Sequence, residues 1–307
     1  GGWADVGGGA AGGAGGGQFS GVEVFVGVVG EPAGRAGDLV HLGEALLLRL
    51  AHLTADDVGH LIGVLIDEVG EPTPDLDTSG WHVGDEVMAY ARKDWVQAGS
   101  FAEKMTVPVR AAARKPDSLS FAQAGALPLA GLTAYQSLHR LGLTAGQTVL
   151  VHGANGGVGS FAVQIAAAAG ARVIGTASER SHERIRGLGA EPVTYGDGLE
   201  ERVRAMAPGG ADLVVDYVGG VLEQTLAVLA PGGRHASIAD DSVAEAGGAY
   251  LWVRPDAGDL AALAELVESG SLRVDVERTF DLADAADAFR ASMEGHTSGK
   301  IVVTVGE

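Results

Sequence analysis

TVLVHGANGGVGSFA, residues 148–162, is the stretch that decides the fold we expect for this chain. It begins with residues of β character, passes through a glycine-dense turn and opens an apolar helical run. Gly157, Gly159 and Ala162 match the pattern G-x-G-x-x-A, which marks a dinucleotide-binding turn when it joins a strand to a helix. The glycines permit a sharp turn and a close approach of backbone to a pyrophosphate, and the start of the helix attracts phosphate. A purely structural βα turn is the competing interpretation, which the strand–turn–helix setting disfavours.

Strands and helices alternate after this turn. Apolar residues at helical spacing form one buried face: Val158, Phe161, Ala162, Ile165 and Ala169. Further strands are expected at 172–175, 192–195, 213–217 and 233–239, with helices at 199–206 and 221–229. This alternation predicts an α/β fold with a doubly wound parallel sheet, the Rossmann arrangement.

The flanking regions carry more scattered signals. The first 17 residues contain ten glycines and are not expected to fold on their own. Strands are expected at 22–29, 63–70, 83–90, 99–107 and 300–305, and a leucine-rich helix at 39–53. Ser120 is a plausible cap for a helix that presents Phe121, Ala124 and Leu127 on one face. Later helices are expected at 129–141, around Leu260 to Val267, and at 282–293.

Composition narrows the classes of function. The 307 residues carry a formal charge of −19, which argues against nucleic acid or an anionic membrane as a partner. There is no cysteine, so disulfides, thiolate catalysis and cysteine-ligated zinc are excluded. No apolar run reaches membrane-spanning length and no signal pattern opens the sequence, so the cytoplasm is the expected location.

The end of the second strand bears on the choice of coenzyme. NAD enzymes usually place a carboxylate there, about 20 residues after the glycines, to bind the ribose hydroxyls. This chain has Thr176 at that point, followed by Ser178, Glu179 and Arg180. Ser178 and Arg180 could bind a 2′-phosphate, which favours NADP. In the alternative interpretation, Glu179 is the ribose ligand and Arg180 is an ordinary solvated residue.

From about Val83 to the C-terminus the sequence resembles the quinone oxidoreductase (zeta-crystallin-like) family of medium-chain dehydrogenases/reductases. The matching pieces, in the family's order, are VGDEV (83–87), GSFAE (99–103), ALPLAGLTAY (126–135), the glycine turn, GLGA (187–190), DYVGG (216–220) and GKIV (299–302). The resemblance implies a GroES-like, β-rich substrate domain formed by residues 1–118 and 256–307. A Rossmann NADP-binding domain, residues 119–255, would be inserted into it.

The resemblance also implies a site in the cleft between these domains. The expected contacts to NADP(H) are Thr133, Asn155, Gly156, Gly157, Val158, Gly159, Ser178, Arg180, Tyr195, Val218 and Lys300. The candidates for the substrate pocket are Tyr90, Thr133 and Trp252. Four of these residues have a plainer interpretation. Thr133 would be bonded to its own helix backbone, Tyr90 would be a core residue and Trp252 a packing residue. Lys300 would be a surface lysine. The family commonly dimerises by joining sheet edges, so a homodimer is expected.

Residues 1–62 depart from the family's pattern. The Asn-Pro-x-Asp element that lines the family's active site is missing, since Asn155 is the only asparagine in the chain. A divergent segment and an out-of-frame stretch both explain this, and intact mass spectrometry distinguishes them. Gly59-His60 faintly resembles the start of the zinc site of related alcohol dehydrogenases, but Leu61 stands where that site has glutamate. We therefore expect no catalytic metal.

The function expected from the sequence is NADPH-dependent hydride transfer to a quinone or an α,β-unsaturated carbonyl, without a metal. Two alternatives remain. One is an NADPH-binding protein with little catalysis, acting structurally or as a redox sensor. The other is an enoyl-thioester reductase of a biosynthetic pathway.

Overall fold

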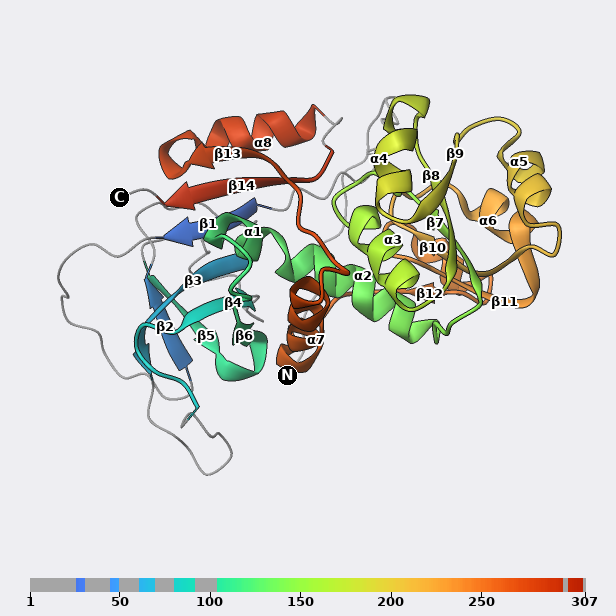
Figure 1. Cartoon of the computed structure of the whole chain (residues 1–307). Helices are drawn as coiled ribbons and strands as arrows, with labels where there is room; N and C mark the ends of the chain where they lie inside the picture. Colours follow the sequence, from blue (N-terminus) through green and yellow to red (C-terminus); the bar gives the residue numbers. More distant parts are fainter. Residues whose placement is uncertain are drawn as a thin grey trace, which may run out of the picture.

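The computed structural model describes residues 26–30, 45–49, 61–69, 80–91, 104–294 and 298–305. Several features expected from the sequence lie wholly or partly outside these residues: the glycine-rich segment 1–17, the Gly59-His60 pair, and parts of the elements expected at 22–29, 39–53 and 99–107. The described residues form two sheets with helices packed around and between them (Figure 1).

The first sheet is parallel throughout and has the strand order β12-β11-β10-β7-β8-β9. In chain order its strands are β7 (Thr148–His152), β8 (Arg172–Thr176), β9 (Ala190–Val193), β10 (Ala211–Asp216), β11 (Leu229–Ser237) and β12 (Ala249–Tyr250). The chain winds outward in both directions from β7 and β10, so a switch point lies between these two central strands. In such sheets ligands bind at the carboxyl ends of the strands beside the switch point.

Helices cover both faces of this sheet, as the alternation predicted. Successive residues of a strand point to opposite faces. Val149 and Val151 pack in the core that includes α3 (Gly159–Ala168), whereas Leu150 packs in the core formed with α5 (Leu199–Met206) and α6 (Leu222–Val228). The helix α4 (His182–Gly187) connects β8 to β9.

The second sheet gathers strands from both ends of the chain. Its main path is β13-β14-β1-β3-β2-β5, and β4 pairs with both β3 and β6. The strands are β1 (Val26–Gly30), β2 (Ala45–Arg49), β3 (Leu61–Val69), β4 (Glu86–Tyr90), β5 (Lys104–Pro108), β6 (Ala112–Arg114), β13 (Val276–Asp281) and β14 (Lys300–Val305). The late strand β14 pairs in parallel with the early strand β1, so the Rossmann sheet is inserted into a β-rich unit. The predicted fold class is confirmed.

The helix expected over residues 39–53 is wrong where the structure describes that segment. Residues 45–49 form β2, which pairs antiparallel with β3 on one side and with β5 on the other. A short leucine-rich run fits a buried strand as well as a helix segment. Here the hydrogen bonds available from two neighbouring strands decide the outcome, and those neighbours lie far away in the sequence.

Two consecutive helices connect β6 of the second sheet to β7 of the parallel sheet. The helices α1 (Phe121–Ala126) and α2 (Pro128–Arg140) follow Ser120, whose side chain accepts a hydrogen bond from Gln123 N at 3.2 Å, as the predicted cap requires. Gln123 Oε1 accepts in return from Ser120 N at 3.0 Å, which completes a capping box. The helix α2 lies between the two sheets beside α3 and α7 (Ala257–Glu268) (Figure 1). The last helix, α8 (Ala285–Met293), covers β13 and β14.

Candidate coenzyme site

The glycine turn after β7 is anchored to the end of β8. Gly153 has a positive φ of 75°, and its N–H donates to Thr176 Oγ1 at 3.0 Å. The next amide, Ala154 N–H, donates to the Thr176 carbonyl at 3.1 Å. A Cβ on Gly159 would lie 2.1 Å from Gly153 O, so no side chain fits at the second fingerprint position. The close approach of the helix to the turn therefore explains why glycine is needed there.

The helix α3 offers its N-terminus to this turn. Its cap residue, Val158, has no side-chain oxygen, and no side chain caps the helix. The partial positive charge of the first turn is therefore left for a ligand, and a phosphate is the ligand that such a site prefers. The glycine turn and the start of α3 together form a cradle that fits a dinucleotide diphosphate.

A lysine from the other sheet reaches the same turn. Lys300 begins β14 and is only 3% exposed. A Cβ built on Gly157 would lie 3.2 Å from Lys300 Nζ, so the ammonium group lies directly against the turn. The interpretation of Lys300 as a surface lysine is therefore wrong, because the side chain is buried beside the glycines. This places a positive charge from the β-rich unit at the proposed diphosphate site.

Asp216 fixes the turn that follows β10, and this turn lies against the glycine turn. Asp216 ends β10, and its Oδ1 accepts from Val218 N at 2.9 Å and from Gly219 N at 3.0 Å. Its Oδ2 accepts from Ser237 Oγ at 2.8 Å. A Cβ on Gly153 would lie 2.6 Å from Val218 Cγ1, so the turn after β10 lies against the glycine turn. Val218 thus lies against the glycine turn.

Two further polar residues continue this arrangement. Ser237 ends β11, and its Oγ accepts from Ala239 N and Asp240 N, each at 3.0 Å. His152 ends β7 beside Asp216, and its Nε2 lies 3.2 Å from Thr225 Oγ1. Burial lowers the pKa of His152 to about 4, although the Asp216 carboxylate acts in the opposite direction. The sequence analysis missed these residues, although a polar residue that closes an apolar strand was the signal available.

The residues proposed for the 2′-phosphate lie at the carboxyl ends of β8 and β9. These strands are parallel neighbours, so the segments that follow them share one edge of the sheet. Ser178 Oγ lies 3.2 Å from Ser181 Oγ. Arg180 is exposed and makes no hydrogen bond or ion pair with the residues that the structure describes. Tyr195 follows β9 and is 60% exposed.

The three substrate-pocket candidates come from separate segments of the chain: β4, α2 and the segment after β12. Tyr90 ends β4 and is buried in the large core that also includes Leu127 and Leu132. Thr133 Oγ1 donates to Leu129 O at 2.7 Å, which is the bond to its own helix that the plainer alternative expects. Trp252 is 70% exposed and meets the edge of the Tyr250 ring beyond β12, the outermost strand of the parallel sheet.

Two further features are absent from the described residues. Within this part of the chain no group of three or more histidine, aspartate or glutamate side chains could hold a metal ion. Likewise, none of the helices that the structure describes has the length and apolar character needed to cross a bilayer.

A Rossmann sheet with a glycine turn, an uncapped helix and a lysine supplied by a second β-rich unit defines a two-domain dinucleotide-dependent protein. Comparison with known proteins specifies the family. The family described as "Zinc-binding dehydrogenase" matches residues 188–303. The human mitochondrial NAD(P)H oxidoreductase RTN4IP1 is 32% identical over 268 residues, which cover 75% of this chain and 67% of that protein. The chain belongs to the medium-chain dehydrogenase/reductase family, alongside quinone and NAD(P)H oxidoreductases.

Other relatives extend this comparison. The chloroplastic NADPH-dependent alkenal/one oxidoreductase of Arabidopsis thaliana is 33% identical over 80% of this chain and 63% of its own length. A spectinabilin polyketide synthase system protein of Streptomyces orinoci is 34% identical over 80% of this chain, which spans only 12% of that protein.

Solved structures agree with this placement. The quinone oxidoreductase of Coxiella burnetii matches with a TM-score of 0.73 and 29% identity, over 85% of this chain and 90% of that one. A mycobacterial protein complexed with NADPH matches with a TM-score of 0.71 and 26% identity, over 85% of this chain and 91% of that one.

Proposed function

We propose that the protein is an NADPH-dependent oxidoreductase that transfers a hydride to a quinone or an α,β-unsaturated carbonyl without a metal ion. The observation that carries this proposal is the glycine cradle, where a Cβ at Gly159 would lie 2.1 Å from Gly153 O and Lys300 Nζ lies against Gly157. Relatives that are named quinone or NADPH-dependent alkenal/one oxidoreductases support the substrate class.

The bound coenzyme supplies a hydride from its nicotinamide C4. The residues of this chain bind and orient it. The amides between Gly156 and Ser160 bind the diphosphate, and Lys300 balances its charge. The turn that Asp216 holds, with Val218 at its surface, supports the nicotinamide half from the carboxyl end of β10. Holding C4 against an electron-poor acceptor is the main catalytic contribution of such a site.

The preference for NADPH is assigned to Ser178 and Arg180, with Tyr195 beside them. Arg180 makes no bond to a described residue, so its guanidinium is available to a phosphate. The last residue of β8, Thr176, already holds the Gly153 amide and is not a carboxylate that could bind the ribose hydroxyls of NAD. Substituting Arg180→Ala should lower the affinity for NADPH about tenfold or more and leave that for NADH unchanged. Equal effects on both coenzymes would contradict this assignment.

Absence of a catalytic metal is proposed from the available ligands. The chain has no cysteine, and the described residues contain no cluster suited to a metal. Reduction of a quinone or an activated C=C bond needs no Lewis acid on an alcohol oxygen, unlike alcohol oxidation by zinc enzymes. Turnover should therefore be unchanged after dialysis against a chelator and after addition of zinc. Loss on dialysis with recovery on zinc addition would overturn this point.

The match to part of a polyketide synthase favours a second candidate, reduction of an enoyl thioester. A third candidate is a coenzyme-binding protein with little catalysis. NADPH oxidation measured with matched quinone, enone and enoyl-thioester panels separates the three. The primary proposal expects saturable turnover with quinones or enones. A large preference for enoyl thioesters selects the second candidate, and tight NADPH binding without turnover on any panel selects the third.

We also propose a cytoplasmic homodimer. The strand β12 is an outer strand of the parallel sheet, and no strand in the described part of the chain pairs with its far side. Tyr250 and Trp252 are both more than a third exposed there, with their rings in T-shaped contact. An open edge beside exposed aromatic rings is suited to pairing with a second copy. Sedimentation velocity should show twice the mass of the chain, and a single-chain mass at micromolar concentration would contradict the dimer.

A further inference from the structure

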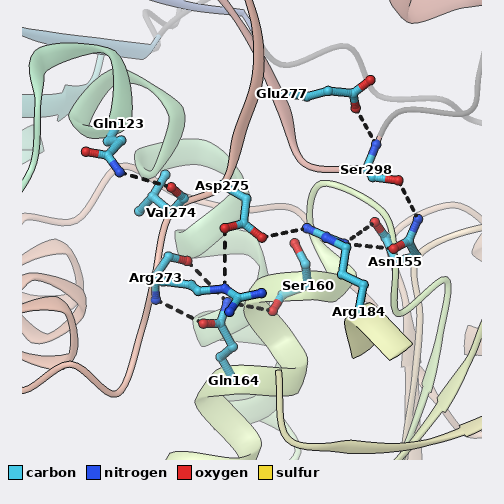
Figure 2. Close-up of polar contacts among 10 residues, drawn as sticks. All are labelled: Gln123, Asn155, Ser160, Gln164, Arg184, Arg273, Val274, Asp275, Glu277 and Ser298. Atoms are coloured by element: carbon cyan, nitrogen blue, oxygen red, sulfur yellow. Dashed lines mark hydrogen bonds and ion pairs between the residues drawn. The ribbon is translucent and has the colours of Figure 1, made fainter. Parts of the chain in front are cut away.

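A network of polar contacts, which we call the polar seam, lies beside the glycine turn (Figure 2). It links residues of the Rossmann domain to the segments that lead into β13 and β14. It is centred on residues 273–275, which lead from α7 into β13. Gln164 of α3 holds Arg273 twice, accepting from its N–H at 2.9 Å and donating Nε2 to its carbonyl at 3.2 Å. Gln123 Nε2 of α1 donates to Val274 O at 3.3 Å. The segment is therefore fixed by side chains from α1 and α3.

Arg184 of α4 connects this segment to the glycine turn. Its Nη1 donates to Asn155 O at 3.1 Å and to Asn155 Oδ1 at 2.8 Å. Its Nη2 donates to Asp275 Oδ2 at 3.0 Å, while Arg273 Nε lies 3.3 Å from Asp275 Oδ1. One planar guanidinium thus binds the turn with one nitrogen and the seam with the other, which a lysine ammonium could not reproduce in the same geometry.

Asn155 is held at every polar atom of its side chain. Its Oδ1 accepts from Arg184, and its Nδ2 donates to Ser298 Oγ at 3.2 Å. Ser298 N in turn donates to Glu277 Oε2 in β13. Asn155 lies inside the glycine turn, one residue before Gly156. Fixing it from α4 on one side and from the approach to β14 on the other fixes the backbone of the turn.

Asp275 extends the same control to Lys300. Its carbonyl accepts from Lys300 N at 2.9 Å. The preceding residue, Gly299, has a φ of 132°, and a Cβ there would lie 2.7 Å from Asp275 O. The start of β14 is therefore pressed against Asp275. Arg184 consequently binds both groups that set the relative position of the glycine turn and Lys300.

We propose that Arg184 is a positioning residue for the coenzyme diphosphate, acting through Asn155 on the amides of the turn and through Asp275 on Lys300. Arg184 holds the glycine turn and Lys300 in their relative positions before the coenzyme binds. Binding therefore does not have to order these two groups, which would cost conformational entropy. This inference rests on the coenzyme site proposed above. A bond to the backbone carbonyl of the turn itself distinguishes it from an ion pair that only joins two domains.

The test is calorimetric titration of NADPH and NADH onto the wild type, Arg184→Met and Arg184→Lys. Arg184→Met should weaken both coenzymes by the same factor, about tenfold, as expected for loss of one charged hydrogen bond of some 1.4 kcal/mol. Arg184→Lys should recover only part of this loss, because one ammonium cannot bind Asn155 and Asp275 together. In steady state, the KM for coenzyme should rise while kcat at saturating coenzyme changes less than about twofold.

The matched control is Arg172→Met. Arg172 also pairs with a carboxylate, Glu191, but at the opposite end of β8. Arg172→Met should lower thermal stability slightly without changing coenzyme affinity. Asn155→Ala should weaken binding as Arg184→Met does, and the double variant should lose less than the sum of the two.

Unchanged coenzyme affinity in both Arg184 variants would overturn the inference, as would an equal loss in Arg172→Met. If Arg184→Met fails to fold, Arg184→Lys and Asn155→Ala give the same comparison. A wild-type protein that binds neither coenzyme would instead refute the proposed function, which keeps the two failures distinct.

Discussion

The two ends of the parallel sheet treat polar side chains in opposite ways. At the carboxyl end, four neighbouring strands, β8, β7, β10 and β11, each end in a polar residue that is at most 3% exposed: Thr176, His152, Asp216 and Ser237. At the amino end, Arg172 and Glu191 form a bidentate pair at 2.6 and 2.8 Å with both side chains more than 40% exposed.

The difference in burial of these polar side chains indicates which end of the sheet has fixed turns. A buried polar group is costly unless it is hydrogen-bonded, so its burial needs a reason. At the carboxyl end the reason is visible: Thr176, Asp216 and Ser237 accept hydrogen bonds from the amides of the turns that follow the strands. At the amino end the polar groups join strands and meet solvent. In sheets of this kind ligands bind at the carboxyl ends of the strands, which is the end where these hydrogen bonds hold the turns.

The largest effect is expected from Gly159→Ala. The new Cβ would lie 2.1 Å from Gly153 O, so either the turn or the helix must move. The free energy of unfolding should fall by about 3 kcal/mol or more, and coenzyme binding should become undetectable by calorimetry. Urea denaturation and titration with NADPH measure the two effects. Gly187→Ala is the control, because no atom lies within 4 Å of the position its Cβ would take. If Gly159→Ala bound NADPH with wild-type affinity, the proposed role of the glycine turn as the diphosphate cradle would be contradicted.

Next comes a pair of identical substitutions at opposite ends of β10. Asp216→Asn removes one of two acceptor oxygens that serve Val218 N, Gly219 N and Ser237 Oγ. It should cost about 2 kcal/mol of stability and weaken coenzyme binding about tenfold. Asp212 accepts from Thr148 N at 2.8 Å at the amino end, and Asp212→Asn should leave coenzyme affinity unchanged. Equal binding losses in the two variants would remove the distinction between the ends.

The third prediction concerns pH. The pKa of His152 falls from 6.5 to about 4 on folding, because burial disfavours its charged form. Between about pH 6.5 and pH 4, His152 is therefore protonated in the unfolded chain and neutral in the folded chain. The stabilising contribution is complete above about pH 6.5 and is lost as pH falls towards 4, by roughly 3 kcal/mol. The difference in unfolding free energy between wild type and His152→Gln should shrink over this window. A constant difference from pH 7 to pH 4.5 would show that His152 titrates normally.

The smallest effect is expected from Arg172→Met. An exposed ion pair contributes about 1 kcal/mol or less, and its contribution should decline further in high salt. The affinity for NADPH should match that of the wild type. Thermal melts at low and high salt, together with one titration, are sufficient. A coenzyme defect in this variant would mean that the amino end also shapes the site.

The sequence predicted what is local. Residues 148–162 specified the strand, turn and helix of the candidate coenzyme site, and the Ser120 cap was predicted at the correct position. What it did not predict depends on partners distant in the chain. Arg184 meets Asp275 across 91 residues, and Lys300 reaches Gly157 from a strand near the C-terminus. The segment 45–49 became a strand because β3 and β5 lie on either side of it. No local pattern encodes such contacts, because they follow from how the two sheets come together.

One calorimetric experiment tests the central claim most directly: NADPH and NADH titrated separately onto the wild-type chain at the same salt. The glycine cradle and Lys300 predict binding of both coenzymes. Arg180 predicts that NADPH binds at least about tenfold more tightly, equivalent to roughly 1.4 kcal/mol. No heat with either coenzyme at millimolar concentration would contradict the coenzyme site itself, and equal affinities would contradict the role of Arg180.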